Sequence, residues 1–171
     1  MTIIGVDPSS TCTGYGLLEY QSPICRFVAC GCIRPPRGMA FEDRLVVMFD
    51  QLRAVIEQYR PAEAAVELTF YGKDPDAAAK LGHARGVLLL ALRLASVSTA
   101  SYTPAEVKKA VTGSGRASKQ QIQLVTAKLL GLKQLPRPYD ASDALAIALC
   151  HSFRPGALRA LAPTGRRPEI D

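Results

Sequence analysis

Residues 2–16 read TIIGVDPSSTCTGYG, and they predict how the chain begins to fold. Thr2–Asp7 is a short, mostly apolar run of the kind that forms a strand inside a sheet. Pro8 keeps the preceding residue extended, so we expect the Asp7 carboxylate at the end of this strand. After a turn, Thr13–Tyr20 predicts a second strand that returns antiparallel to the first. The chain therefore opens with a hairpin that carries an acidic residue beside its turn.

The rest of the chain predicts an α/β protein, with a mixed five-stranded sheet flanked by helices. Apolar side chains recur at helical spacing through residues 41–59, for example at Leu45, Met48 and Leu52. Further strands are expected at residues 26–33, 64–70 and 97–102, and further helices at 76–96, from Pro104, at 118–130 and at 140–153. We expect residues 1–153 to form one domain and residues 154–171 to be a basic, disordered tail.

The composition favours a folded domain with an acidic partner. The chain has 171 residues, of which 48% are hydrophobic, which allows one domain with a real core and excludes disorder throughout. Its formal net charge is +6, and residues 104–139 hold seven basic side chains against Glu106 alone. Because the basicity is regional, it predicts a nucleic-acid interface, to which Lys109 and Arg116 would contribute.

The cysteines and the N-terminus favour the cytoplasm. The five cysteines are an odd number in a chain with a substantial core, which indicates reduced thiols. Cys25, Cys30 and Cys32 lack the spacing of a structural zinc site, so we interpret them as small apolar residues. The first residues do not resemble a signal peptide, and the most apolar stretch, Val87–Leu92, is too short to span a membrane.

Four carboxylates are candidates for a metal-dependent hydrolytic site. Asp7 closes an apolar strand, and Glu67 interrupts another. Asp140 and Asp143 lie three apart at a helix start, so they share one face. If the two strands are neighbours, Asp7 and Glu67 converge at the edge of the sheet, and a helix packed across that edge would add Asp140 and Asp143. Hard divalent cations would relieve the repulsion within such a cluster. Two such ions would clamp a phosphodiester.

Each carboxylate also has a structural interpretation. Asp140 and Asp143 could cap a helix or complement its dipole. Glu67 could point to solvent, because Ala64, Val66 and Leu68 would alternate onto the opposite face. Asp7 before Pro8 could be turn chemistry.

A set of motifs in a fixed order is more specific than any single residue. In chain order, the motifs are Asp7-Pro8 with TGYG at 13–16, GCIR at 31–34, ELTF at 67–70, KLGHARG at 80–86 and DASDALAIA at 140–148. With this ordered set, the chain resembles the RuvC family of Holliday-junction resolvases over roughly Met1 to Phe153. The sequence departs from the family at Ser9, where glycine is usual and a positive φ would strain serine.

The resemblance implies a ribonuclease H-like fold, a homodimer and nicking of two opposed strands in four-way junction DNA, with two Mg²⁺ or Mn²⁺ ions per site. It also implies a partnership with a branch-migration motor complex. Carried over by position, the metal ligands would be Asp7, Glu67, Asp140 and Asp143. Lys108 and Lys119 would lie near the scissile phosphate, and Phe70 would stack on an unpaired base or belong to the core.

The long helix at residues 76–96 is consistent with a dimer on physical grounds. Gly82 and Gly86 share one face, and Val87–Leu92 is apolar all round, so the helix needs cover on every side. One side could meet the sheet and the other a two-fold mate, or the helix could be fully buried in a monomer.

Two other functions remain open at this point. A binding module would keep the basic region and use the acids only as caps and turns, although acids beside phosphates do not favour binding. The hairpin at residues 7–16 also resembles the phosphate-binding hairpin of sugar-kinase and actin-like ATPases. Those proteins place the nucleotide between two such domains, and 171 residues leave no room for a second one.

Overall fold

A computed structural model describes residues 1–68 and 74–154, and it confirms the mixed five-stranded sheet. The strand order is β3-β2-β1-β4-β5. β1 pairs antiparallel with β2, which pairs antiparallel with β3, whereas β1-β4 and β4-β5 are parallel. The strands are β1 (Thr2–Asp7), β2 (Thr13–Gln21), β3 (Ile24–Ile33), β4 (Glu63–Glu67) and β5 (Ser98–Tyr102). Because β1 and β4 are parallel neighbours, their acidic last residues lie at the same edge of the sheet.

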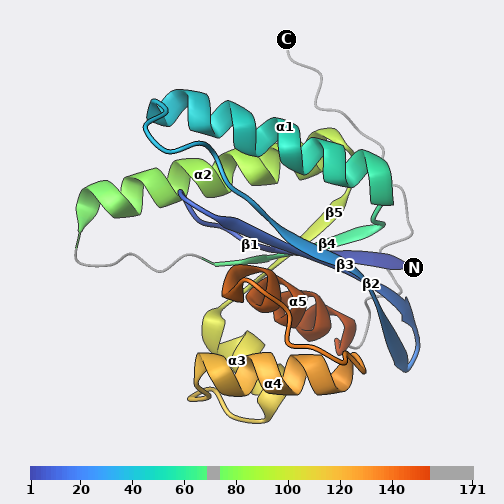
Figure 1. The fold of residues 1–171 in the computed structure, drawn as a ribbon. Coiled ribbons are helices and arrows are strands. Elements are labelled where there is room, and N and C mark those ends of the chain that lie inside the picture. Colours follow the sequence, from blue (N-terminus) through green and yellow to red (C-terminus); the bar gives the residue numbers. More distant parts are fainter. Residues whose placement is uncertain (69–73, 155–171) are drawn as a thin grey trace.

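Helices cover both faces of the sheet (Figure 1). α1 (Phe41–Tyr59) and α2 (Pro75–Leu94) pack together on one face. α5 (Tyr139–Ser152) lies on the other face, and α3 (Pro104–Thr112) and α4 (Lys119–Leu129) pack against α5. The sheet separates two apolar clusters, one under α1 and α2 and one around α5. The predicted elements are thus present, with bounds that shift by a few residues.

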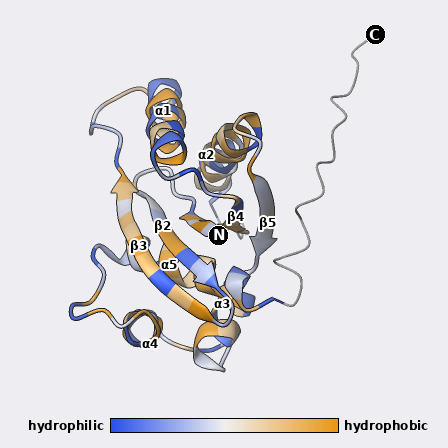
Figure 2. Ribbon diagram, turned by 90° about the vertical axis from the view of Figure 1, so that its right-hand side faces the viewer, coloured by the Kyte–Doolittle hydropathy of each residue, from blue (hydrophilic) through white to orange (hydrophobic). Residues whose placement is uncertain are grey.

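Hydropathy explains this layering. In Figure 2 the ribbon of α1 carries both hydrophobic and hydrophilic segments, and most of β3 is hydrophobic. Met48, Leu52 and Ile56 of α1 are buried against the sheet, as the helical spacing predicts. No helix in the described ranges combines the length and apolarity that crossing a membrane requires.

Local capping explains where α3 and α4 begin. The Thr103 hydroxyl accepts from the Glu106 N–H, and the Glu106 carboxylate accepts from the Thr103 N–H. Ser118 and Gln121 make the same reciprocal pair at the start of α4. Such capping boxes satisfy backbone donors that a helix N-terminus leaves free. They place Lys108 and Lys119 at defined positions on two successive short helices.

Close contact between α5 and the sheet depends on glycine. A Cβ added to Gly5 would lie 2.0 Å from the Ala144 carbonyl oxygen, and one added to Gly14 would lie 2.0 Å from the Asp140 carbonyl oxygen. No side chain fits at those separations, so glycine at both positions lets the helix approach the strands. This approach brings the start of α5 next to the end of β1.

Several expectations lie outside the described residues or differ in detail. The strand expected at 64–70 ends at Glu67, and Phe70 falls outside the described residues, as does the tail from residue 155. Ser9 is not among the residues with positive φ, so the expected strain is not observed at this position. Its hydroxyl instead accepts from the N–H groups of Thr11 and Cys12. The turn after β1 therefore accommodates serine without a left-handed backbone.

Candidate active site

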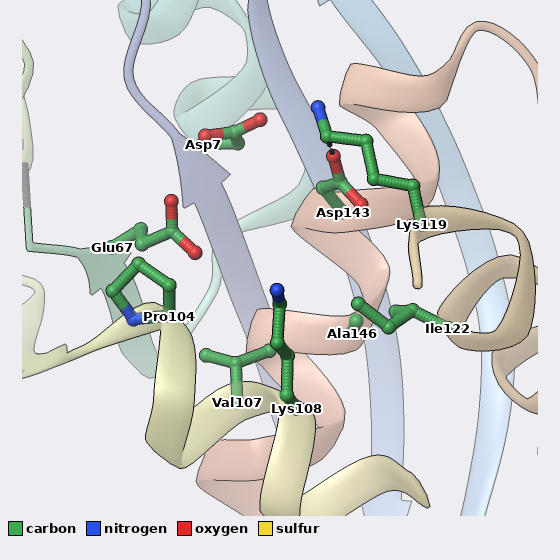
Figure 3. A pocket seen from close by; sticks show the side chains of 9 residues that line it. All are labelled: Asp7, Glu67, Pro104, Val107, Lys108, Lys119, Ile122, Asp143 and Ala146. Carbon is green, nitrogen blue, oxygen red and sulfur yellow. Dashed lines mark ion pairs between the residues drawn. The ribbon is translucent and has the colours of Figure 1, made fainter. Parts of the chain in front are cut away.

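Three of the four predicted carboxylates line one cavity of about 210 Å³. Asp7 comes from the end of β1, Glu67 from the end of β4 and Asp143 from the first turns of α5. Lys108 of α3 and Lys119 of α4 complete its charged lining. Figure 3 shows these side chains directed into the same space from five different elements. The convergence predicted from strand adjacency is thus observed for these three acids.

The acids of this cavity repel one another. Burial, and after it the charges of Glu67, Asp143 and Asp140, together raise the pKa of Asp7 to about 8, against the opposing effect of Lys119. Burial, and after it the charge of Asp143, raises the pKa of Glu67 to about 7, against the opposing effects of Lys119 and Lys108. At neutral pH some of these groups therefore retain protons unless a cation balances them.

Lysine balances part of this negative charge. The Lys119 ammonium lies 3.7 Å from the Asp143 carboxylate. Burial raises the pKa of Asp143, and Lys119 opposes that shift. No hydrogen bond or ion pair joins the side chains of Asp7 or Glu67 to another residue in the described ranges. Oxygen donors with unbalanced charge in an open cavity are suited to a hard divalent cation, so the residues present fit such an ion.

The structural interpretations explain only part of this arrangement: Asp140 lies in the first turn of α5, where it complements the helix dipole. The N-cap residue of α5 is Pro138, and the cap has no side-chain hydrogen bond, so neither Asp140 nor Asp143 caps the helix in this way. Glu67 lines the cavity and is half-buried rather than directed into solvent. Asp7 also lines the cavity, which turn chemistry does not explain.

Asp140 occupies a different position from the other three acids. It is not among the residues that line the cavity, although its charge still raises the pKa of Asp7. Its Oδ2 accepts from the Cys12 thiol at 3.3 Å. Cys12, Cys32 and Asp140 bring one ligand atom each within 4.8 Å of one another. Asp140 therefore lies between the cavity and a pair of thiols.

Sequence patterns do not reveal the two thiols beside Asp140. Cys12 belongs to none of the motifs, and the prediction that Cys32 is simply a small apolar residue overlooks its polar neighbours. The register between β2 and β3 would have revealed that the two cysteines are close, because Gly14 pairs with Cys32 and Thr13 pairs with Ile33. Cys12 therefore lies diagonally across the hairpin from Cys32. The separation of 20 residues along the chain conceals this proximity.

The other predicted DNA-binding residues are less closely placed. Lys109 and Arg116 are exposed and do not line the cavity, whereas Lys108 and Lys119 do. Phe70 lies outside the described residues. The structure thus separates two lysines within reach of the acids from two basic residues on the surrounding surface.

Comparison with known proteins gives a consistent result. A model of the family described as crossover junction endodeoxyribonuclease RuvC matches residues 3–151. Proteins of that name from Chloroflexus aurantiacus and Moorella thermoacetica are each 44% identical to the chain, over 153 and 167 residues. These matches cover 90% and 97% of the chain and 93% and 100% of the relatives. The structure of T. thermophilus RuvC in complex with Holliday junction substrate matches with a TM-score of 0.84 at 33% identity, covering 90% of this chain and 93% of that one.

Proposed function

The chain belongs to the RuvC family of crossover junction endodeoxyribonucleases, and we propose that its acidic cavity hydrolyses phosphodiester bonds in two opposed strands of a four-way DNA junction. The observation that carries this proposal is the joint placement of Asp7, Glu67 and Asp143 with two lysines in one open cavity. This arrangement provides negative charge to hold cations and positive charge to hold a phosphate.

The family's nuclease activity requires a divalent metal, and the donor set here suits Mg²⁺ or Mn²⁺. We assign Asp7, Glu67, Asp140 and Asp143 as the ligands, with two ions in each site. Asp7, Glu67 and Asp143 line the cavity, and Asp140 would reach it by turning away from Cys12. Ions bound there supply an activated water molecule and stabilise the leaving oxygen.

The protein's own residues perform the remaining work. Lys108 and Lys119 would orient the scissile phosphate and stabilise the charge that builds on its oxygens. Lys119 also holds the Asp143 carboxylate in place through their contact at 3.7 Å. Lys109 and Arg116, both exposed, would bind the flanking backbone, and Phe70 would stack on an unpaired base at the crossover.

Cleavage of two opposed strands requires two cavities, which a homodimer supplies. Gly82, Gly86, Leu90 and Leu94 recur every four residues along α2 and are exposed. A Cβ added to either glycine would meet nothing within 4 Å, so this stripe is open to a second helix. Leu88, Ala91 and Leu92 are buried on the other side of α2. We therefore assign the exposed stripe to a two-fold interface.

The proposal extends to the cellular setting. We place residues 1–153 in the nuclease domain and leave the basic tail outside it. An enzyme that acts on recombining chromosomal DNA would work in the cytoplasm beside a branch-migration motor complex.

The test is nicking of a synthetic four-way junction in the presence of Mg²⁺. We expect the wild type to cut two opposed strands, and Asp143→Asn to bind the junction without cutting it. Asp50→Asn is the matched control, because Asp50 is exposed on α1, across the sheet from the cavity. If the wild type binds junctions but does not nick them with either Mg²⁺ or Mn²⁺, the non-catalytic binding module is the correct function.

A further inference from the structure

The side chains of Cys12, Cys32 and Asp140, which we call the thiol cluster, form a second group of possible ligands beside the acidic cavity. One donor atom from each lies within 4.8 Å of the others. The Cys12 thiol donates to Asp140 Oδ2 at 3.3 Å. All three residues are half-buried, so the cluster is both held by the protein and open on one side.

The fold holds these three residues in place from separate elements. Cys12 directly precedes β2, and Cys32 lies near the end of β3, where it pairs with Gly14. Asp140 lies in the first turn of α5, which rests directly on Gly14. The β2–β3 hairpin and α5 are therefore in direct contact at Gly14. Binding an ion would require little further ordering of the two thiols and the carboxylate.

The donor chemistry differs from that of the cavity. Two sulfur atoms and one carboxylate oxygen form a soft set, which zinc-like ions prefer and Mg²⁺ does not. In tetrahedral zinc sites neighbouring sulfur ligands lie roughly 3.8 Å apart, so the donor atoms, which lie within 4.8 Å of one another, would need to move together by at most about 1 Å. Its open side would leave the fourth position to water.

Arg34 contacts the thiol cluster and would compete with a metal. Its Nε donates to the Cys12 Sγ at 3.1 Å. The Arg34 side chain is exposed, so it can turn into solvent when an ion takes its place.

We propose that Cys12, Cys32 and Asp140 form a binding site for a thiophilic divalent ion of the zinc class, and that this ion competes with the catalytic cluster for Asp140. Metal binding by the thiol cluster stands independently of the proposed function. Its inhibitory effect on cleavage rests on the proposed role of Asp140 there. A zinc-class ion would hold this carboxylate on the hairpin side of α5 and leave the cavity one ligand short.

Binding is tested with Co²⁺ as a spectroscopic probe for Zn²⁺, using the reduced full-length protein without DNA. Thiolate-bound cobalt gives a near-ultraviolet charge-transfer band that cobalt bound by carboxylates lacks. We expect a band that saturates at one equivalent, persists in a large excess of Mg²⁺ and disappears when Zn²⁺ is added. Cys12→Ser and Cys32→Ser should each weaken binding at least tenfold, and Asp140→Asn should weaken it to a smaller extent.

Cys30→Ser is the matched control. Cys30 lies two residues before Cys32 on the same strand and is also half-buried, but it is not part of the thiol cluster. It should retain the cobalt band. Cys12→Ala supplements Cys12→Ser in case serine disturbs the turn. Absence of the band in the wild type, or its persistence at full strength in both Cys12 variants, would overturn the metal site.

The inhibitory effect is measured separately, by comparing nicking in Mg²⁺ with and without one equivalent of Zn²⁺. Each variant is compared with its own zinc-free rate. We expect Zn²⁺ to slow the wild type and Cys30→Ser at least tenfold and Cys12→Ser much less. Equal inhibition of all three would place the inhibitory ion in the carboxylate cavity and overturn the competition for Asp140. A wild type that binds cobalt but nicks nothing without zinc contradicts the proposed function and leaves the metal site standing.

Discussion

Strand β4 carries a glutamate at each end, and the two side chains have opposite surroundings. Glu63 is 5% exposed, and its carboxylate lies 2.7 Å from Nε2 of His151. The other ring nitrogen of His151 lies 2.6 Å from the hydroxyl of the buried Tyr102. Glu67, four residues later, faces Asp7 and Asp143 across the cavity. Glu63 thus has a hydrogen-bonded partner, whereas Glu67 lies among other acids whose repulsion the two lysines of the cavity only partly offset.

The difference gives a criterion for telling a buried acid with a structural role from one with a catalytic role. A buried carboxylate with a hydrogen-bonded partner ties elements together, here β4 to α5 and, through Tyr102, to β5. A carboxylate held among other carboxylates destabilises the fold unless a cation is present. Such an arrangement persists because it performs chemistry. Glu67 and Glu63 allow this distinction to be tested within a single five-residue strand.

The largest expected effect is on catalysis at the Glu67 end. Glu67→Gln keeps the shape of the side chain but removes a ligand charge, so we expect nicking to fall by at least ~10³-fold, which corresponds to about 4 kcal/mol of transition-state stabilisation. Junction binding should remain, because the lysines are unchanged. Single-turnover nicking at saturating protein measures the first quantity, and gel-shift titration measures the second. Turnover within tenfold of the wild type would remove Glu67 from the ligand set.

The next effect is on stability at the Glu63 end. Glu63→Ala leaves the buried His151 without its acceptor, and we expect a loss of about 3 kcal/mol in the free energy of unfolding. Glu63→Gln should lose less, because the amide oxygen can still accept a hydrogen bond from the His151 ring. Urea unfolding measures both variants.

Nicking per folded molecule is the complementary readout for this strand. It should stay within a few-fold of the wild type for Glu63→Gln, in contrast to Glu67→Gln. A thousandfold loss of turnover in a well-folded Glu63→Gln protein would contradict the assignment of a structural role to Glu63 and a catalytic role to Glu67.

Sequence patterns predict one end of this strand better than the other. Glu67 stands out because it interrupts an apolar run and belongs to an ordered set of motifs. Glu63 and His151 lie 88 positions apart, and neither residue type nor spacing indicates their contact. The same applies to Cys12 and Asp140, which meet because glycine lets α5 rest on the hairpin. Periodicity thus predicts elements and faces, whereas individual side-chain partners depend on packing between distant segments.

A smaller effect concerns pH and stability in the absence of metal. The folded-state pKa of Asp7 is about 8 and that of Glu67 about 7, both above the ordinary values of 3.8 and 4.5. The folded state therefore binds more protons than the unfolded state between these limits, so stability falls as pH rises from about 4 to about 8. In chelator at pH 8, Asp7→Asn should be more stable than the wild type by on the order of 1–2 kcal/mol.

Thermal melts at pH 5 and pH 8 provide this measurement, at about 2–4 °C per kcal/mol for a chain of this size. The advantage of Asp7→Asn should nearly vanish at pH 5, where Asp7 and Glu67 of the wild type are protonated. Added Mg²⁺ should reverse the order at pH 8, because the ions stabilise the intact cluster. Asp50→Asn serves as the control and should show neither effect. An Asp7→Asn protein that is less stable than the wild type at pH 8 in chelator would contradict repulsion within the cluster.

The smallest effect tests whether the lysines of the cavity bind DNA phosphates. Each neutralised phosphate adds about 0.9 to the slope of log affinity against log salt, so Lys108→Ala or Lys119→Ala should flatten the slope by about one unit for each phosphate left without its lysine. In a homodimer each lysine occurs twice, which allows a change of up to about two units. Arg53→Ala is the control, since Arg53 pairs with Glu57 on α1, across the sheet from the cavity.

The two lysines should differ in how they affect the reaction at saturating protein, where binding no longer limits the rate. Lys119 lowers the pKa of Asp143 and lies 3.7 Å from its carboxylate, so its removal should leave Asp143 protonated to a higher pH. Nicking by Lys119→Ala should therefore recover in part as pH rises, whereas Lys108→Ala, which keeps the Lys119–Asp143 ion pair, should show a pH profile closer to the wild type. Salt slopes and saturated rates equal to those of the wild type in both variants would make these side chains a solvated surface. Retained slopes with a shifted pH profile for Lys119→Ala would instead show that Lys119 serves the acids of the cavity and not the DNA.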